Sequence, residues 1–140
     1  MSDSMSGNSM AAEELDVLDP SVLNSLRDLP SRESDSILTR VLRSYRESAP
    51  GLVAKVNSAI EACDAITLTS AAHRLGSSSA SIGAIRLSRH FRKLEALGRD
   101  GTTLGAEAIR VELNREVDLV LAATLQELEA EKERSTSELG

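Results

Sequence analysis

The stretch that decides the fold is ILTRVLRSYRESAPGLVAKVNSAI, residues 37–60. Its apolar residues recur at steps of three and four, the period of one buried helix face. They are Leu38, Val41, Leu42, Tyr45, Ala49, Leu52, Val53, Val56, Ala59 and Ile60. A proline inside a helix costs about 3 kcal/mol, but the apolar period keeps its phase across Pro50-Gly51. The pattern therefore predicts one long helix, kinked at Pro50.

The flanking segments also carry helix signals. Asp19-Pro20, a capping residue followed by proline, begins a short helix that Pro30 ends. Asp64 caps a helix over residues 64–80, and residues 81–83 form a turn. Apolar residues at helical spacing predict two more helices, over residues 87–97 and 103–128.

Short connections between long amphipathic helices favour antiparallel neighbours. We therefore predict an all-α fold, an antiparallel up-down four-helix bundle with an additional short N-terminal helix. Residues 1–12 are expected to be a flexible lead, residues 13–130 the bundle, and residues 131–140 a charged flexible tail. The composition agrees, because Tyr45 and Phe91 are the only aromatic residues and a core of Leu, Ile, Val and Ala suits helix packing.

The composition also argues against several functional classes. A net charge of −6 argues against nucleic-acid binding, which needs a basic face. Cys63 is the only cysteine, so the sequence predicts no disulfide framework and no thiolate metal cage. No apolar run approaches the roughly 20 residues that cross a bilayer, and the first residues lack the features of a signal peptide. We expect a cytoplasmic protein without direct membrane insertion.

The segment AAHRLGSSSA, residues 71–80, carries the candidate chemistry. At about 100° per residue, Leu68, Leu75 and Ser79 share the core face and His73 points to solvent. Its neighbours on the same side are all small, namely Ser70, Gly76, Ser77 and Ala80. An exposed imidazole in such a clearing is accessible to a reactive group on another protein. Neutral imidazole has a nucleophilic lone pair and forms a labile phosphoramidate, so the pattern indicates phosphoryl carriage.

Other interpretations of these residues stay open at this point. His73 on its own is equally compatible with a plain surface histidine. His90 lies among long basic side chains, and we expect no catalytic role for it. Neither histidine has an acidic residue three or four positions away, so no metal site is predicted. The serines at residues 77–79 have no base placed for them and are interpreted as small packing and clearance residues.

The run from Leu52 to Leu97 resembles the histidine phosphotransfer (Hpt) family, whose pattern is approximately A-H-x-L-K-G-S-S-A-x-(L/I)-G-A followed by L-x(6)-L-E. The matching residues are Ala72, His73, Leu75, Ser78, Ser79, Ala80, Ile82, Gly83, Ala84, Leu87, Leu94 and Glu95. Where the family usually has lysine and then glycine after the histidine, this chain has Gly76 and Ser77. Arg74 is the nearest substitute for the missing positive charge, although it projects to a different side.

The resemblance implies a phosphorelay intermediate. His73 would accept a phosphoryl group from a receiver-domain aspartate and pass it to another receiver. The partners implied are response-regulator receivers and a hybrid sensor histidine kinase, with no cofactor on this chain, Mg²⁺ on the receiver, and a monomeric state. No nucleotide-binding segment is present, so we expect no ATP-dependent kinase activity. The main alternative is a catalytically weak Hpt-fold module that regulates a receiver or an enzyme by binding; a purely structural bundle is a third.

A basic rim would steer an acidic receiver to the site. Its residues are Arg74, Arg86, Arg89, Arg92, Lys93 and Arg99, set against a single Glu95. The other interpretation of such a run is a solvated helix face. The predicted site is thus the phosphoacceptor His73, with a phosphoryl environment and docking surface formed by Ser70, Arg74, Gly76, Ser77, Ala80, Arg86 and Arg89.

Overall fold

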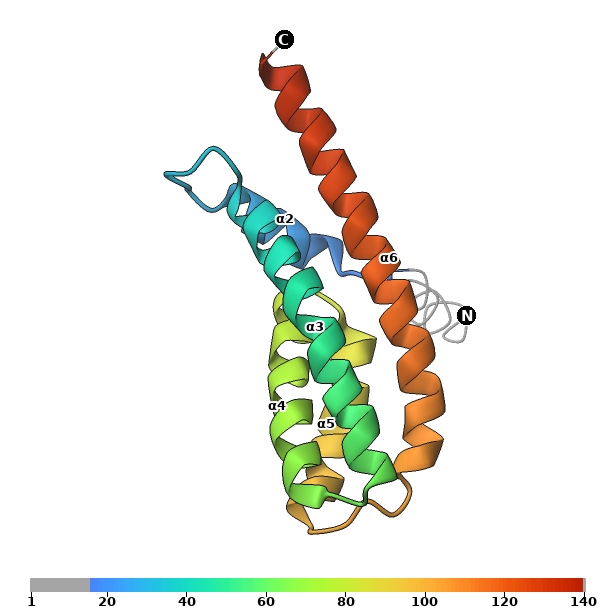
Figure 1. Cartoon of the computed structure of the whole chain (residues 1–140). Coiled ribbons are helices and arrows are strands. Elements are labelled where there is room, and N and C mark those ends of the chain that lie inside the picture. Colours follow the sequence, from blue (N-terminus) through green and yellow to red (C-terminus); the bar gives the residue numbers. More distant parts are fainter. Residues whose placement is uncertain (1–15, 140) are drawn as a thin grey trace, which may run out of the picture.

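The computed structural model describes residues 16–139, and this part of the chain contains five helices and no strand. They are α2 (Pro20–Asp28), α3 (Ile37–Glu61), α4 (Ala65–Ser81), α5 (Ile85–Arg99) and α6 (Ala106–Leu139). The four longer helices run alternately down and up, α2 lies near the upper ends of α4 and α5, and α6 extends beyond it (Figure 1). The predicted bundle with a short extra helix is confirmed. The flexible lead predicted for residues 1–12 lies outside the described residues.

Helix α3 runs without a break through Pro50, as the apolar period predicted. Ser36 caps it, because the Ser36 hydroxyl accepts a hydrogen bond from the backbone N–H of Thr39 at 3.1 Å. Leu38, Leu42 and Val56 are fully buried on its inner face. Burial of this face offsets the cost of the internal proline, so packing keeps the helix continuous.

Helices α4 and α5 pack closely because small residues lie where they meet. A Cβ atom on Gly98 of α5 would lie 2.8 Å from the carbonyl oxygen of Ala65 and 3.0 Å from the amide nitrogen of Thr69, both backbone atoms of α4. Further along, the hydroxyl of Ser88 donates to the carbonyl oxygen of Gly76 at 2.8 Å. These two contacts restrict the sliding of α5 along α4.

The turn after α4 holds the start of α2. Gly83 has φ +81°, a left-handed conformation that favours glycine, and its carbonyl oxygen accepts the N–H of Asp19 at 2.9 Å. A Cβ on Gly83 would lie 2.9 Å from that same nitrogen. The carboxylate of Asp19 then caps α2 through the N–H of Ser21 at 2.9 Å. The predicted Asp19-Pro20 helix start is confirmed, and Gly83 ties it to the bundle.

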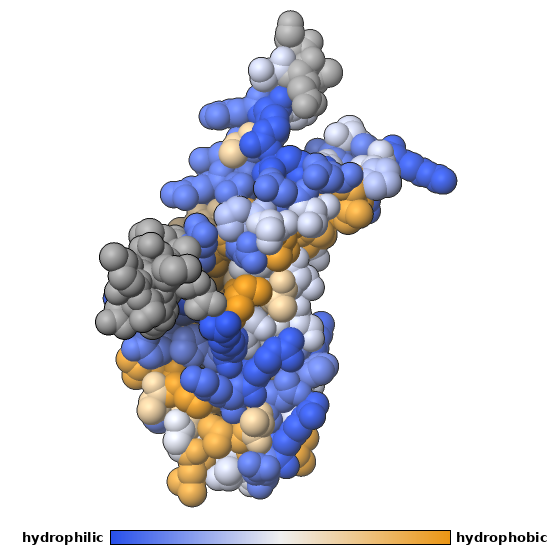
Figure 2. Space-filling model, turned by 180° about the vertical axis from the view of Figure 1, so that it is seen from behind, coloured by the Kyte–Doolittle hydropathy of each residue, from blue (hydrophilic) through white to orange (hydrophobic). Residues whose placement is uncertain are grey.

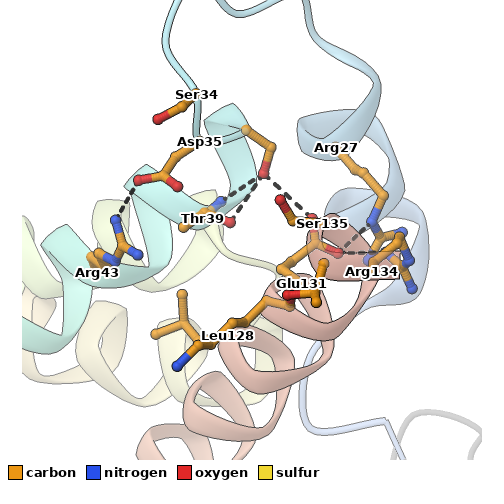
Figure 3. Close-up of a pocket in the computed structure, with 12 residues that line it drawn as sticks. Arg27, Ser34, Asp35, Thr39, Arg43, Leu128, Glu131, Arg134 and Ser135 are labelled. Carbon is orange, nitrogen blue, oxygen red and sulfur yellow. Dashed lines mark hydrogen bonds and ion pairs between the residues drawn. The ribbon is translucent and has the colours of Figure 1, made fainter. Parts of the chain in front are cut away.

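The end of α6 differs from the prediction. Residues 131–140 were expected to form a flexible tail, but the helix continues to Leu139. Glu131 is buried there, accepting hydrogen bonds from Arg27 of α2 at 2.9 Å and from Ser36 at 3.3 Å, and it also pairs with Arg134. Figure 3 shows Arg27 and Arg134 directed at this carboxylate. A tertiary contact with α2, invisible to helix periodicity, therefore extends the ordered helix past Leu128.

Candidate functional site

His73 projects from the outer face of α4, and 57% of its side chain is exposed. Leu68, Leu75 and Ser79 on the opposite face are fully buried. The outward orientation predicted for His73 is confirmed. Ser70 and Ser77, one turn before and after it, are also exposed, and Ala80 is half-buried. The face around the imidazole is therefore formed by short side chains.

Glu95 of α5 is the hydrogen-bond partner of the imidazole. The Nδ1 atom of His73 lies 2.9 Å from Oε2 of Glu95, and only 10% of the Glu95 side chain is exposed. The same oxygen forms an ion pair with Nη2 of Arg99 at 2.5 Å. A carboxylate paired with an arginine can only accept, so Nδ1 carries the proton and donates it. Nε2 is then the atom with the free lone pair, on the side of the ring away from Glu95.

The close packing of α4 and α5 positions this pair. Glu95 follows Phe91 by four residues and precedes Gly98 by three, so it shares the buried face of α5. A carboxylate in an apolar stripe requires a partner, because burying an unpaired charge is costly. This phase is the signal in the sequence that could have identified Glu95, but it was not used for the prediction. Glu95 matched the family pattern, but its pairing with His73 was not predicted because the two residues lie on different helices.

Gly76 is not part of the exposed clearing, contrary to the prediction. It is buried, and a Cβ atom there would lie 3.6 Å from Cγ of Arg92 and 3.7 Å from Cβ of Phe91. The error arises because rotation about α4 alone does not show where α5 crosses it. Helix α5 crosses α4 here, one turn beyond His73, where the Ser88 hydroxyl donates to the carbonyl oxygen of Gly76.

The basic residues predicted around the site differ in where they lie and in what they contact. Arg86 pairs with Glu116 of α6 at 3.0 Å, so this arginine is held on the side of α5 that faces α6. Arg74 is exposed on α4 and Arg89 is exposed on α5. Arg99 pairs with Glu95, and Cγ of Arg92 lies 3.6 Å from the place that a Cβ of Gly76 would occupy. Sequence reasoning placed both in the basic rim but not in the site.

An apolar residue shares the His73 face and was missed. Ile66 precedes His73 by two helical turns, so it lies on the same side of α4, and it is 85% exposed. Leu104 and Val111, near the same end of the bundle, are 82% and 70% exposed. Figure 2 shows hydrophobic surface gathered toward this lower end, whereas the upper part is mostly hydrophilic. The face of α4 that carries His73 therefore also exposes an apolar side chain, that of Ile66.

His90 has a different setting from His73. It is half-buried on α5, and burial, followed by the nearby charge of Lys93, lowers its pKa. Within residues 16–139, no group of three or more histidine, cysteine, aspartate or glutamate side chains is arranged to hold a metal ion. Within the same range, no helix has the length and apolarity that crossing a membrane requires.

The comparisons with known proteins agree with the fold. The profile described as the Hpt domain matches residues 40–131. The crystal structure of histidine-containing phosphotransfer protein B (HptB) from Pseudomonas aeruginosa PAO1 is similar with a TM-score of 0.73 and 26% identity, over 83% of this chain and 97% of that one. The HPT domain of a sensor hybrid histidine kinase from Shewanella gives a TM-score of 0.70 at 22% identity, over 81% and 95% of the two chains, a likeness of fold. No curated protein is similar enough in sequence to be assigned as a relative.

Proposed function

The chain belongs to the Hpt domain family, and from this premise we propose that His73 accepts a phosphoryl group from a receiver-domain aspartate and passes it to a second receiver. Hpt domains carry out histidine phosphotransfer in phosphorelays, where receiver domains and hybrid kinases are their partners. The observation that carries the assignment to His73 is its hydrogen bond to Glu95, which leaves Nε2 unoccupied on an open face.

The chemistry follows from the tautomer. Nε2 attacks the phosphorus of the aspartyl phosphate, an N–P bond forms, and the P–O bond to the aspartate breaks, so the receiver regains its carboxylate. The ring keeps its proton on Nδ1 and becomes positively charged. The carboxylate of Glu95, 2.9 Å away, stabilises that charge. In the second transfer a receiver carboxylate attacks phosphorus, the N–P bond breaks, and neutral imidazole leaves.

The surface around His73 suits docking by another protein. Ser70, Ser77 and Ala80 offer little steric obstruction, and Arg74 and Arg89 add positive charge at the edges. A receiver domain presents acidic side chains and the Mg²⁺ that its own aspartate requires, so charge would favour the encounter. The chain itself then contributes the nucleophile, its orientation and the docking face, and the receiver contributes the metal.

The direct test is transfer from a phosphorylated receiver in the presence of Mg²⁺. Wild type should acquire acid-labile, base-stable phosphate, and His73→Gln should acquire none. His90→Gln is the matched control, because it removes the other histidine while leaving α4 intact, and it should be labelled like wild type. A wild-type chain that binds receivers from its own source but is never labelled would contradict the carrier function and favour the regulatory module.

Glu95 can be tested without any partner. Nitrogen-15 NMR of the neutral imidazole should report the Nδ1–H tautomer of His73 in the wild type. Glu95→Gln can donate its own amide N–H to Nδ1 and should shift the ring toward the Nε2–H tautomer. Because that tautomer has no lone pair on Nε2, transfer should slow by about tenfold or more, as for other residues that orient a reacting histidine. An unchanged tautomer in this variant would refute the role given to Glu95.

A further inference from the structure

Arg92 of α5 lies against α4 at position 76, where α4 has a glycine and therefore no side chain. Position 76 is a glycine, and the Cγ atom of Arg92 lies 3.6 Å from the place a Cβ would occupy there. The stem of Arg92 therefore lies over α4 at the point where a side chain would begin, at ordinary van der Waals distance from it. A longer side chain at position 76 would take the space that Arg92 fills. Gly76 and Arg92 are therefore complementary in shape.

That contact places Arg92 beside the phosphoacceptor. Residues three apart on a helix have Cβ atoms about 5–6 Å from one another, so the stem of Arg92 over Gly76 is one turn from His73. The guanidinium extends beyond Cγ and is long enough to span that turn. Arg74 is nearer in sequence, but it lies about 100° around α4 from His73 and points away from α5.

The charge of Arg92 is not used within the fold. Arg92 is exposed, and it forms no hydrogen bond or ion pair with any of residues 16–139. Arg99, the other α5 arginine beside the site, is already paired with Glu95 at 2.5 Å. Arg99 thus neutralises the Glu95 carboxylate that orients His73. Arg92 keeps its guanidinium N–H groups unpaired among the described residues. An arginine held by its stem with free donors is suited to bind an anion.

We propose that Arg92 binds the oxygens of the phosphoryl group on Nε2 of His73, so that α5 supplies across the helix pair the positive charge that α4 lacks at position 76. The inference rests on the proposed function and names a further catalytic residue for it. The phosphoryl group carries up to about two negative charges, and guanidinium donors form short, charge-assisted bonds to such oxygens. Arg92 would speed formation of the N–P bond and slow its hydrolysis.

The test uses the full chain and a small phosphoryl donor, so that receiver docking does not enter. Phosphoramidate is the donor, and ³¹P NMR follows both the formation and the hydrolysis of phosphohistidine. Arg92→Gln should slow formation and shorten the half-life of phosphohistidine, each by about tenfold, the effect of one charge-assisted hydrogen bond. Arg115→Gln, which removes the same charge from an exposed position of α6, should behave like wild type.

Rescue separates a phosphoryl contact from a structural role. Arg92→Lys should recover part of the half-life, and Gly76→Lys in the Arg92→Gln background should recover it from the other helix. The unfolding midpoint and the His73 tautomer should be unchanged in Arg92→Gln. A wild-type half-life in Arg92→Gln, or an equal loss in Arg115→Gln, would overturn the role of Arg92 and leave the carrier function standing. Absence of receiver-dependent labelling in wild type would instead remove the carrier function, and the phosphoramidate result would still report on Arg92.

Discussion

Alanine in place of Gly98 should destabilise the protein, whereas the same change at Gly51 should stabilise it. Both glycines lie inside helices, where alanine is favoured by about 1 kcal/mol. No atom lies within 4 Å of a Cβ at Gly51, so this gain should appear in full. A Cβ at Gly98 would meet the side-chain oxygen of Thr69 at 2.2 Å and the backbone of α4 at 2.8 and 3.0 Å.

The size of the effect follows from these distances. Thr69 can rotate its hydroxyl away, but the two backbone contacts can be relieved only if α5 moves off α4. Overpacking of this kind costs about 1–3 kcal/mol, and contacts to rigid backbone favour the upper end of that range. After subtraction of the propensity gain, Gly98→Ala should lower the free energy of unfolding by about 1–2 kcal/mol. The difference between the two variants isolates the steric cost.

Urea unfolding followed by far-UV circular dichroism measures both free energies on the same scale. The same displacement should lengthen the contact between His73 and Glu95, so Gly98→Ala should also slow phosphotransfer while Gly51→Ala should not. Equal stabilisation by both substitutions would refute the close approach of α4 and α5 and the positioning of Glu95 that depends on it.

Three further outcomes are expected. Tyr45→Phe removes a hydroxyl that lies 2.9 Å from the fully buried Ser79 hydroxyl, which should cost about 1–3 kcal/mol in urea unfolding, and adding Ser79→Ala should recover most of the loss. Hydrogen bonds from the side chain and N–H of Thr67 lower the pKa of Asp64, so its contribution is present above the ordinary aspartate value and lost as pH falls through the lowered one. The stability gap between wild type and Asp64→Ala should therefore shrink on acidification, and a gap independent of pH would contradict the cap. Ile66→Ser should weaken receiver binding several-fold, because it removes about 1 kcal/mol of apolar contact from the interface. Labelling of His73 by phosphoramidate, which needs no docking, should not change. Leu125→Ser on α6 serves as its control, and an equal loss there would argue against a docking role for Ile66.

The helices were predictable because their signals are local. Apolar spacing predicted the continuous α3, and Asp19-Pro20 and Asp64 predicted where α2 and α4 begin. His73 was predictable in the same way, because its phase relative to Leu75 on one helix decides that it faces solvent. These are properties of a single helix, and its 3.6-residue period is sufficient to derive them.

Contacts between helices were not predictable from such periods. Glu95 meets His73, Arg92 covers Gly76, and Glu131 joins α2 only because particular helices cross at particular heights. Those heights depend on the close backbone approach at Gly98 and on the hydrogen bond between Ser88 and the carbonyl oxygen of Gly76, which involve two helices at once. By itself the sequence determined the five helices, apart from the last turns of α6, and the exposure of His73. The tertiary structure decided which nitrogen of that histidine is free to react and which cations lie beside it, because both depend on the register of α5 against α4.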